Sequence, residues 1–192
     1  LTGVLFKFTP EGLIAVATDG HRLVKHTRKN IRTENFKGEV IIPRKFLSYM
    51  SSYLDEGETT LLIGETHLSA KIKKDTITTR IIGEKFPDYE SVIPKENDKV
   101  FKSEKEAFLG AIKRVSIFSN KSTHQVAISL SSSSCVVTTE DPEKASKAIE
   151  SVDSTFEGGD LTIGYNAEYL KDIVNHIPGQ SIVANFNTPV SA

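Results

Sequence analysis

The chain has 192 residues, with 24 Lys or Arg against 25 Asp or Glu, and 38% of its residues are hydrophobic. This composition is typical of a soluble globular protein and excludes a disordered chain, and no run of about 18 apolar residues occurs that could form a membrane-spanning helix. The one cysteine, Cys135, cannot form an internal disulfide, so the sequence favours a reducing cytosolic setting, and the start at Leu1 rather than Met indicates a fragment of a longer protein.

Apolar residues that recur at every second position predict half-buried antiparallel strands. The alternation occurs in residues 4–8, 68–72, 77–81 and 126–130. Asp19-Gly20 stands between two apolar runs and predicts a hairpin, because the turn needs the positive φ that Gly adopts without strain. A polar run at 131–134 predicts a second hairpin turn.

Helical period occurs in three stretches, residues 43–54, 103–115 and 166–177. Pro43 suits a first helical position, Ser103 with Glu106 fits a capping box, and Asn166 is a good N-cap residue. The expected buried faces are Phe46, Leu47, Met50, Tyr53 and Leu54 in the first helix, Ala107, Phe108, Ala111, Ile112 and Val115 in the second, and Leu170, Ile173, Val174 and Ile177 in the third.

The helix starts are spaced by about 60 residues, with several short strands in each interval, which indicates an internal repeat. The predicted unit is one helix on about four antiparallel strands, an α+β arrangement with the helices on one face of the sheets. A fourth helix is expected near residues 142–152. Residues 83–98 break both periods and carry two prolines, so we expect a linker and a domain boundary near residue 95.

Charge is distributed unevenly along the chain. Residues 21–45 hold eight Lys or Arg against two Glu, whereas residues 140–160 hold seven Asp or Glu against two Lys. Arg44 and Lys45 fall in the first turn of a helix, where the helix dipole disfavours cations, so either a phosphate partner or plain solvation accounts for them. With Lys113 and Arg114 at a helix C-terminus, they predict a basic surface that follows a phosphate backbone without reading bases.

Besides the phosphate-binding surface, two functional interpretations stay open from the residues alone. Asp19 and His21 are either the polar tip of a hairpin or the acid/base pair of a small hydrolase-type enzyme, which would need a deep pocket that gathers titratable groups from distant segments. A β-rich adaptor without DNA contact is the second. Neither a metal nor a cofactor is predicted, because the five His are scattered, one Cys excludes a thiolate cluster, and no glycine-rich phosphate loop occurs.

Several short motifs are similar to those of one protein family and follow that family's order along nearly the whole chain. They are Ala17-Thr18-Asp19-Gly20-His21-Arg22-Leu23, Ile42-Pro43-Arg44-Lys45, Phe86-Pro87-Asp88-Tyr89 with Val92-Ile93-Pro94, Ser119-Asn120, and Ile163-Gly164-Tyr165-Asn166 with Tyr169-Leu170. The set resembles the bacterial DNA polymerase III β sliding clamp. The resemblance implies a DNA-clamp fold and a non-catalytic processivity factor of the bacterial cytoplasm. Such a factor is a ring-shaped homodimer of three-domain subunits that encircles duplex DNA of any sequence and tethers the polymerase to it.

The resemblance also assigns the parts of the chain. Residues 1–94 correspond to most of the middle domain and residues 97–192 to most of the C-terminal domain, without the first domain and the C-terminal peptide. The helices line the central hole, which implies that four cations face DNA phosphates: Arg44, Lys45, Lys113 and Arg114.

A groove between the two domains receives, in that family, a short linear motif from the polymerase α subunit, the clamp loader and other partners. The matching positions are Leu1, Thr18, Gly20, His21, Arg22, Leu23, Pro87 and Val92 on one side, and Asn166, Tyr169, Val190 and Ala192 on the other. Ser91 stands where many relatives carry Arg, so one polar wall of the groove differs.

A second implied surface is the dimer interface. The resemblance implies that Ile117, Phe118 and the acidic side of a helix at 143–150 meet the first domain of the other subunit. Because that domain lies outside this sequence, the fragment alone is not expected to close a ring.

Overall fold

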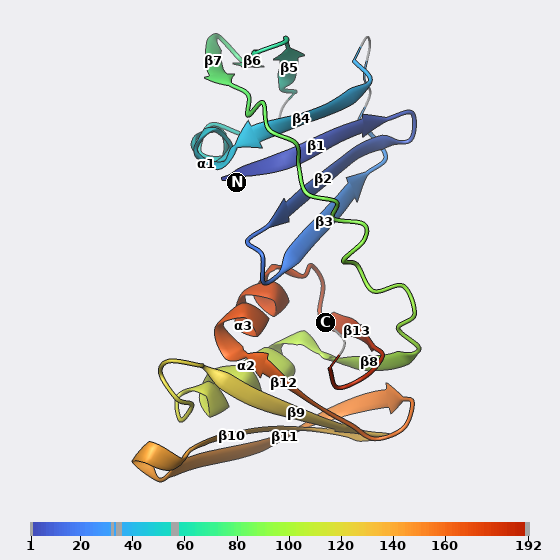
Figure 1. The fold of residues 1–192 in the computed structure, drawn as a ribbon, viewed down its shortest axis with the longest axis vertical. Helices are drawn as coiled ribbons and strands as arrows, with labels where there is room; N and C mark the ends of the chain where they lie inside the picture. Colours follow the sequence, from blue (N-terminus) through green and yellow to red (C-terminus); the bar gives the residue numbers. More distant parts are fainter. Residues whose placement is uncertain (1, 32, 34–35, 55–57, 191–192) are drawn as a thin grey trace. The chain divides into compact units, whose positions relative to one another are not determined.

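The computed structural model describes residues 2–31, 33, 36–54 and 58–190. The chain divides into two compact units, Leu1–Val92 and Ile93–Ala192, and each unit has its own hydrophobic core (Figure 1).

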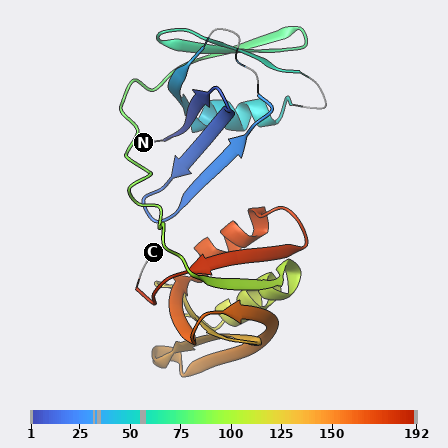
Figure 2. The ribbon, with the colours of Figure 1, turned by 90° about the vertical axis from the view of Figure 1, so that its right-hand side faces the viewer.

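The first unit is built from two antiparallel sheets and one helix. Strands β1 (Gly3–Thr9), β2 (Gly12–Thr18), β3 (Leu23–Arg28) and β4 (Gly38–Pro43) form a sheet in the order β3-β2-β1-β4. Helix α1 (Arg44–Ser51) begins directly after β4, and β5 (Thr60–Ile63), β6 (His67–Ile72) and β7 (Asp75–Arg80) form the second sheet. Phe46 and Met50 of α1 share one core with residues of both sheets, and the helix lies beside them in Figure 2.

Buried residues lie on both faces of the four-stranded sheet, apart from its largely exposed edge strand β3, and the alternation in β1 does not predict this. Phe8 belongs to the core shared with α1, as expected, but Leu5 on the opposite face is only 2% exposed. After β7, Ile82 N–H donates to the Ile41 carbonyl at 3.0 Å on the edge strand β4, and the segment then runs across that opposite face (Figure 1). Phe86 and Tyr89 in this segment are buried, so it covers the sheet as a strap.

The second unit is a six-stranded antiparallel sheet covered by two helices. Its strands are β8 (Lys99–Glu104), β9 (Gln125–Ser131), β10 (Ser134–Asp141), β11 (Ser146–Glu157), β12 (Leu161–Asn166) and β13 (Ser181–Phe186), in the order β12-β9-β10-β11-β8-β13. Helices α2 (Lys105–Ser116) and α3 (Ala167–His176) lie on the same face, as Figure 1 shows. Phe108, Ile112 and Val174 from these helices pack into the sheet's core.

The expected repeat is confirmed by the positions of the helices. Each helix begins at the residue after a strand ends, at Arg44, Lys105 and Ala167, and in the described chain four strands lie between α1 and α2 and four between α2 and α3. The predicted α+β class is therefore correct, as are the two predicted hairpins, which join β2 to β3 and β9 to β10.

The expected fourth helix is wrong. Residues 142–152 contain only a short 3-10 turn, Pro142–Lys144, and then enter β11. Asp141 caps this turn by accepting from Glu143 N–H at 3.2 Å, and Ala145 has a φ of 48° that ends it. Eight residue pairs then join β10 to β11, from Ser134↔Asp153 to Asp141↔Ser146, and this pairing overrides the helical propensity of an acidic, alanine-bearing run.

Details of the three predicted helices also differ. Helix α1 ends at Ser51, where the Ser51 and Ser52 hydroxyls donate to the Ser48 and Tyr49 carbonyls. Tyr53 and Leu54 beyond this end are 43% and 50% exposed rather than buried. In α2, Leu109 is buried instead of Ala107. The predicted capping box at Ser103 is wrong, because the Glu104 carboxylate caps the helix by accepting from the Glu106 and Ala107 N–H groups. Ile173 of α3 is 40% exposed, outside the core.

Candidate functional site

The hairpin between β2 and β3 forms a tightly bonded polar tip. The Asp19 carboxylate accepts from the backbone N–H groups of His21 and Arg22, each at 3.0 Å, and from Arg22 Nε at 2.9 Å. Thr18 Oγ1 donates to the Arg22 carbonyl at 2.8 Å, and Gly20 has a φ of 90°. The structure thus brings together the predicted residues from Thr18 to Leu23, with His21 exposed and Leu23 half-buried.

The same bonds argue against an acid/base role for Asp19. The hydrogen bond from His21 N–H, followed by that from the Arg22 side chain, lowers the pKa of Asp19 to about 2. A carboxylate with this pKa is a weak base near neutral pH. Asp19 therefore stabilises the hairpin, which favours the interpretation of this motif as a hairpin tip.

The strap presents two apolar positions to solvent. Phe86 and Tyr89 are each 7% exposed, so they fix the strap to the sheet, whereas Pro87 is exposed and Val92 is 64% exposed. Lys25 on β3 lies over the Tyr89 ring, 5.5 Å from its centroid, and pairs with Glu90 at 3.5 Å. In the first unit, the predicted groove residues therefore lie on the hairpin tip and on this anchored strap.

The predicted groove residues of the second unit lie at the start of α3 and after β13. Asn166 caps α3 through Oδ1, which accepts from Glu168 N–H at 2.9 Å and from Tyr169 N–H at 3.3 Å. Its Nδ2 donates to the Thr123 carbonyl at 3.2 Å, so the whole amide serves the local fold. Tyr169 is half-buried and Val190 is 94% exposed. Leu1 and Ala192 lie outside the described residues.

The four predicted DNA-facing cations are not equivalent. Arg44 and Lys45 are exposed in the first turn of α1, which has no acidic residue there, and Lys113 is exposed in the last turn of α2. None of these three has an ion-pair partner among the described residues. Arg114 differs, because its Nε donates to Oε2 of Glu150 at 3.0 Å and a terminal nitrogen donates to Oε1. Sequence reasoning missed this pair, since 36 residues separate its members.

Exposed apolar residues follow the end of α2, next to a strand with a free edge. Ile117 and Phe118 are 75% and 46% exposed, and Ile149, on the face of β11 that points away from α2, is 67% exposed. Strand β11 pairs with β8 only through residues 154–157, so in the described chain its residues 146–153 have a strand partner, β10, on one side alone. The acidic segment predicted here as a helix is thus a sheet edge.

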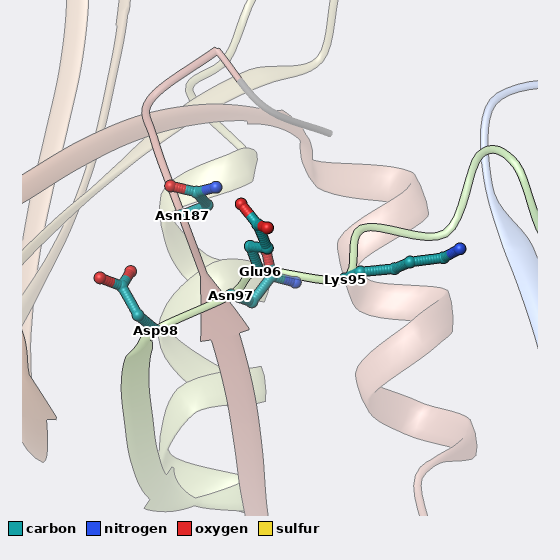
Figure 3. Close-up of a pocket in the computed structure, with 5 residues that line it drawn as sticks. All are labelled: Lys95, Glu96, Asn97, Asp98 and Asn187. Atoms are coloured by element: carbon teal, nitrogen blue, oxygen red, sulfur yellow. The ribbon is translucent and has the colours of Figure 1, made fainter.

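Two hollows on the surface of the second unit are at least partly open to solvent. One, of about 330 Å³, is lined by Lys95, Glu96, Asn97, Asp98 and Asn187, and Figure 3 shows Lys95 extending away from the other side chains. Another, of about 380 Å³, lies on the sheet beside Gln125 and Ile149. Neither gathers titratable groups in an enclosed site. No three His, Cys, Asp or Glu among the described residues are placed to hold a metal, and no described helix is long and apolar enough to cross a membrane.

Comparison with known protein families accounts for both units. The model for the central domain of the DNA polymerase III beta subunit matches residues 1–88, and the model for its C-terminal domain matches residues 90–192. The chain belongs to the DNA polymerase III beta subunit family. The resemblance inferred from the hairpin, strap and α3 motifs is thereby confirmed.

Individual members of the beta subunit family agree with this result. The beta sliding clamp of Pseudomonas putida is 32% identical over 176 residues, which is 91% of this chain and 48% of the relative, and that of Escherichia coli K12 is 31% identical over 194 residues, 100% of this chain and 52% of the relative. The crystal structure of a Pseudomonas aeruginosa sliding clamp bound to griselimycin superposes with a TM-score of 0.94 at 30% identity, covering 99% of this chain and 52% of that one. The chain spans about half the length of the curated relatives it matches.

Proposed function

We propose that the protein to which this chain belongs is a DNA sliding clamp, the processivity factor of a bacterial replicative polymerase. The observation that carries the proposal is the match of both units, in order and over nearly the whole chain, to the central and C-terminal domains of one beta subunit family. Residues 1–94 would form the middle domain and residues 97–192 the C-terminal domain of a three-domain subunit.

Duplex DNA is the proposed partner of the exposed cations. Arg44 and Lys45 occupy a helix N-terminus where the dipole already favours an anion, and no acid among the described residues neutralises them. Lys113 is similarly exposed on α2. Contacts of this kind bind phosphates without sequence preference, as a ring that moves along DNA requires.

A short peptide from polymerases and the clamp loader is the proposed partner of the hairpin tip and strap. Exposed Pro87 and Val92 stand on a strap that Phe86 and Tyr89 hold in place, which provides fixed apolar positions for leucine or phenylalanine anchors. His21 and Arg22 supply a polar rim. Asn166, Tyr169, Val190 and Ala192 would form the opposite side of the groove, and Leu1 would belong to the first side.

A second subunit is the proposed partner of the free edge of β11. An unpaired strand edge offers a row of backbone donors and acceptors to another strand, and the exposed Ile117 and Phe118 beside it add apolar area. The first domain of the second subunit would pair there and close a ring homodimer.

The proposal makes the protein a non-catalytic subunit of the cytoplasm. Support comes from the low pKa of Asp19, which removes the base of the hydrolase alternative, and from Cys135, which is a fully buried free thiol. An adaptor without DNA contact would be favoured instead if charge removal at Arg44, Lys45 and Lys113 left DNA binding unchanged.

Retention of the full-length protein on closed circular DNA tests the proposed clamp. Loaded rings should remain on the circle and leave when it is linearised, and Arg44→Ala with Lys45→Ala should lower a salt-sensitive affinity, with a salt slope reduced by about 2. For the groove, His21→Ala with Pro87→Ala should weaken binding of a peptide with Leu and Phe anchors, while Lys95→Ala serves as control. Equal release from circular and linear DNA would reject the clamp, and unchanged peptide affinity would reject the groove.

A further inference from the structure

Glu150 occupies a position in β11 where a carboxylate needs a partner. The more buried alternate residues of this strand include Ala148, Glu150 and Val152, and the residues between them are exposed. Val152 belongs to the core and Ala148 packs against it. Glu150 therefore lies on the helix-covered face of the sheet, and its side chain is 29% exposed. Partial burial of an unpaired carboxylate is unfavourable, so a charged partner for Glu150 favours this position of the strand, which the pairing with β10 also holds.

Arg114 on α2 is that partner and engages both carboxylate oxygens. Its Nε donates to Oε2 at 3.0 Å and a terminal nitrogen donates to Oε1, a bidentate geometry that adds orientation as well as strength. The hydrogen bond from Arg114 lowers the pKa of Glu150, and the same bond raises the pKa of Arg114. The pair therefore stays charged on both sides at neutral pH.

The absence of a side chain at Gly110 leaves room for the Arg114 guanidinium to reach β11. A Cβ atom at Gly110 would lie 3.1 Å from one terminal nitrogen of Arg114 and 3.3 Å from the other, tighter than most contacts of a real Cβ. The guanidinium thus folds back over the preceding turn of α2. The Arg114 side chain stays 63% exposed, but two of its donors and its charge are engaged by Glu150. It is therefore less suited to contact a mobile phosphate than Lys113, which has no ion-pair partner in the described part of the chain.

The pair acts on the half of β11 that has a free edge. Residues 146–153 pair with β10 alone within the described chain, and Glu150 lies in the middle of that stretch. One further hydrogen bond ties the stretch to the residues just after α2, from Ser146 Oγ to the Phe118 carbonyl at 3.1 Å. Inward-pointing charges on edge strands are a known way in which proteins limit indiscriminate edge pairing.

We propose that Arg114 is a positioning residue for the subunit-pairing edge of β11, which it holds through Glu150, and that it does not bind DNA phosphate. This inference rests on the proposed function, in which that edge meets a second subunit. It leaves Lys113, its neighbour in sequence, as the cation of α2 that faces DNA. Lys113 would then contact DNA, whereas the adjacent Arg114 would support the subunit-pairing edge of β11.

The test uses the full-length protein with Arg114→Ala, Glu150→Gln, the exchanged pair R114E/E150R, and Lys113→Ala as the matched control. Sedimentation at a series of concentrations gives the dimer dissociation constant, and retention on circular DNA at several salt concentrations gives the salt slope. Arg114→Ala and Glu150→Gln should each raise the dissociation constant by roughly threefold to tenfold, and combining them should add little because they break one contact. The exchanged pair should restore most of the loss.

The salt slope separates the two neighbours. Lys113→Ala should lower the slope by about 1, whereas Arg114→Ala should leave it unchanged when the protein is concentrated enough to stay dimeric. A lower slope in Arg114→Ala with unaltered dimerisation would overturn the inference, as would an exchanged pair that dimerises no better than the single variants. The proposed function is tested separately with the wild-type protein, which must dimerise and stay on circular DNA before any variant is compared. Failure of the wild-type protein in either measurement would contradict the proposed function rather than the role of Arg114.

Discussion

A hydrogen bond between Lys105 and Ile177 joins the beginning of α2 to the end of α3. Lys105 Nζ donates to the Ile177 carbonyl at 2.7 Å and to the Asn175 carbonyl at 3.0 Å. These carbonyls belong to the last turn of α3 and the residue after it, where backbone acceptors have no partner within the helix. A cation at a helix C-terminus is also favourable for the helix dipole. The first residue of α2 therefore caps α3.

Lys105→Met should destabilise the second unit by about 1 kcal/mol, because it leaves one part-buried and one exposed carbonyl without their charged donor. Denaturant unfolding followed by circular dichroism measures the change. Lys102→Met is the matched control, since Lys102 is exposed on β8 and should tolerate the change. Equal stability of the two variants would contradict the capping role of Lys105.

The Asp19 carboxyl should titrate near pH 2, well below its ordinary value of 3.8. Because the folded pKa is the lower one, this group stabilises the fold above about pH 4, and the contribution is lost as the pH falls toward 2. NMR titration of the side-chain carboxyl measures the pKa. Arg22→Ala should raise it only part of the way, since the His21 N–H still donates. A midpoint near 3.8 in the unaltered protein would contradict the bonded hairpin tip.

Cys135 should be inert toward alkylating reagents in the folded protein. The thiol is fully buried, and burial raises its pKa to about 12, so almost no thiolate is present at pH 8. Iodoacetamide labelling followed by mass spectrometry should show modification only after denaturation. Rapid labelling under native conditions would mean that the β9–β10 region opens readily.

Gly12→Ala should destabilise the first unit more than Gly20→Ala. Both glycines have positive φ, 134° and 90°, which costs an alanine roughly 1–2 kcal/mol. A Cβ at Gly12 would in addition overlap the backbone carbonyl of Arg28, whereas nothing lies within 4 Å at Gly20. Thermal unfolding compares the two variants, and equal losses would show that backbone strain alone matters at Gly12.

The features that can be predicted from the sequence are those that depend on residues close together along the chain. The turn at Asp19-Gly20 follows from Gly conformation, and the exposed cations of α1 follow from helical period next to Pro43. The fourth helix fails because an acidic, alanine-bearing run forms a strand once β10 offers it a complete antiparallel partner. Local propensity carries no information about that partner.

The candidate site divides in the same way. Its motif residues could be found along the chain, but the bonding of Arg114 could not, since its position at a helix C-terminus predicts a solvated cation equally well. Only the fold brings Glu150 within reach, across three intervening elements. The burial on the second face of the four-stranded sheet could not be predicted either. The strap that covers this face has neither helical nor strand periodicity, so the sequence does not show where it runs after β7.

The direct passage from strand to helix also limits how the sequence can change in length. With no loop between β4 and α1, between β8 and α2, or between β12 and α3, one residue inserted at a junction would rotate the following helix by about 100° relative to its sheet. Phe46 would turn toward solvent and Lys45 toward the core. Insertions and deletions among relatives should therefore avoid positions 43–44, 104–105 and 166–167, and gather in the hairpin loops, where added residues leave every helix face unchanged.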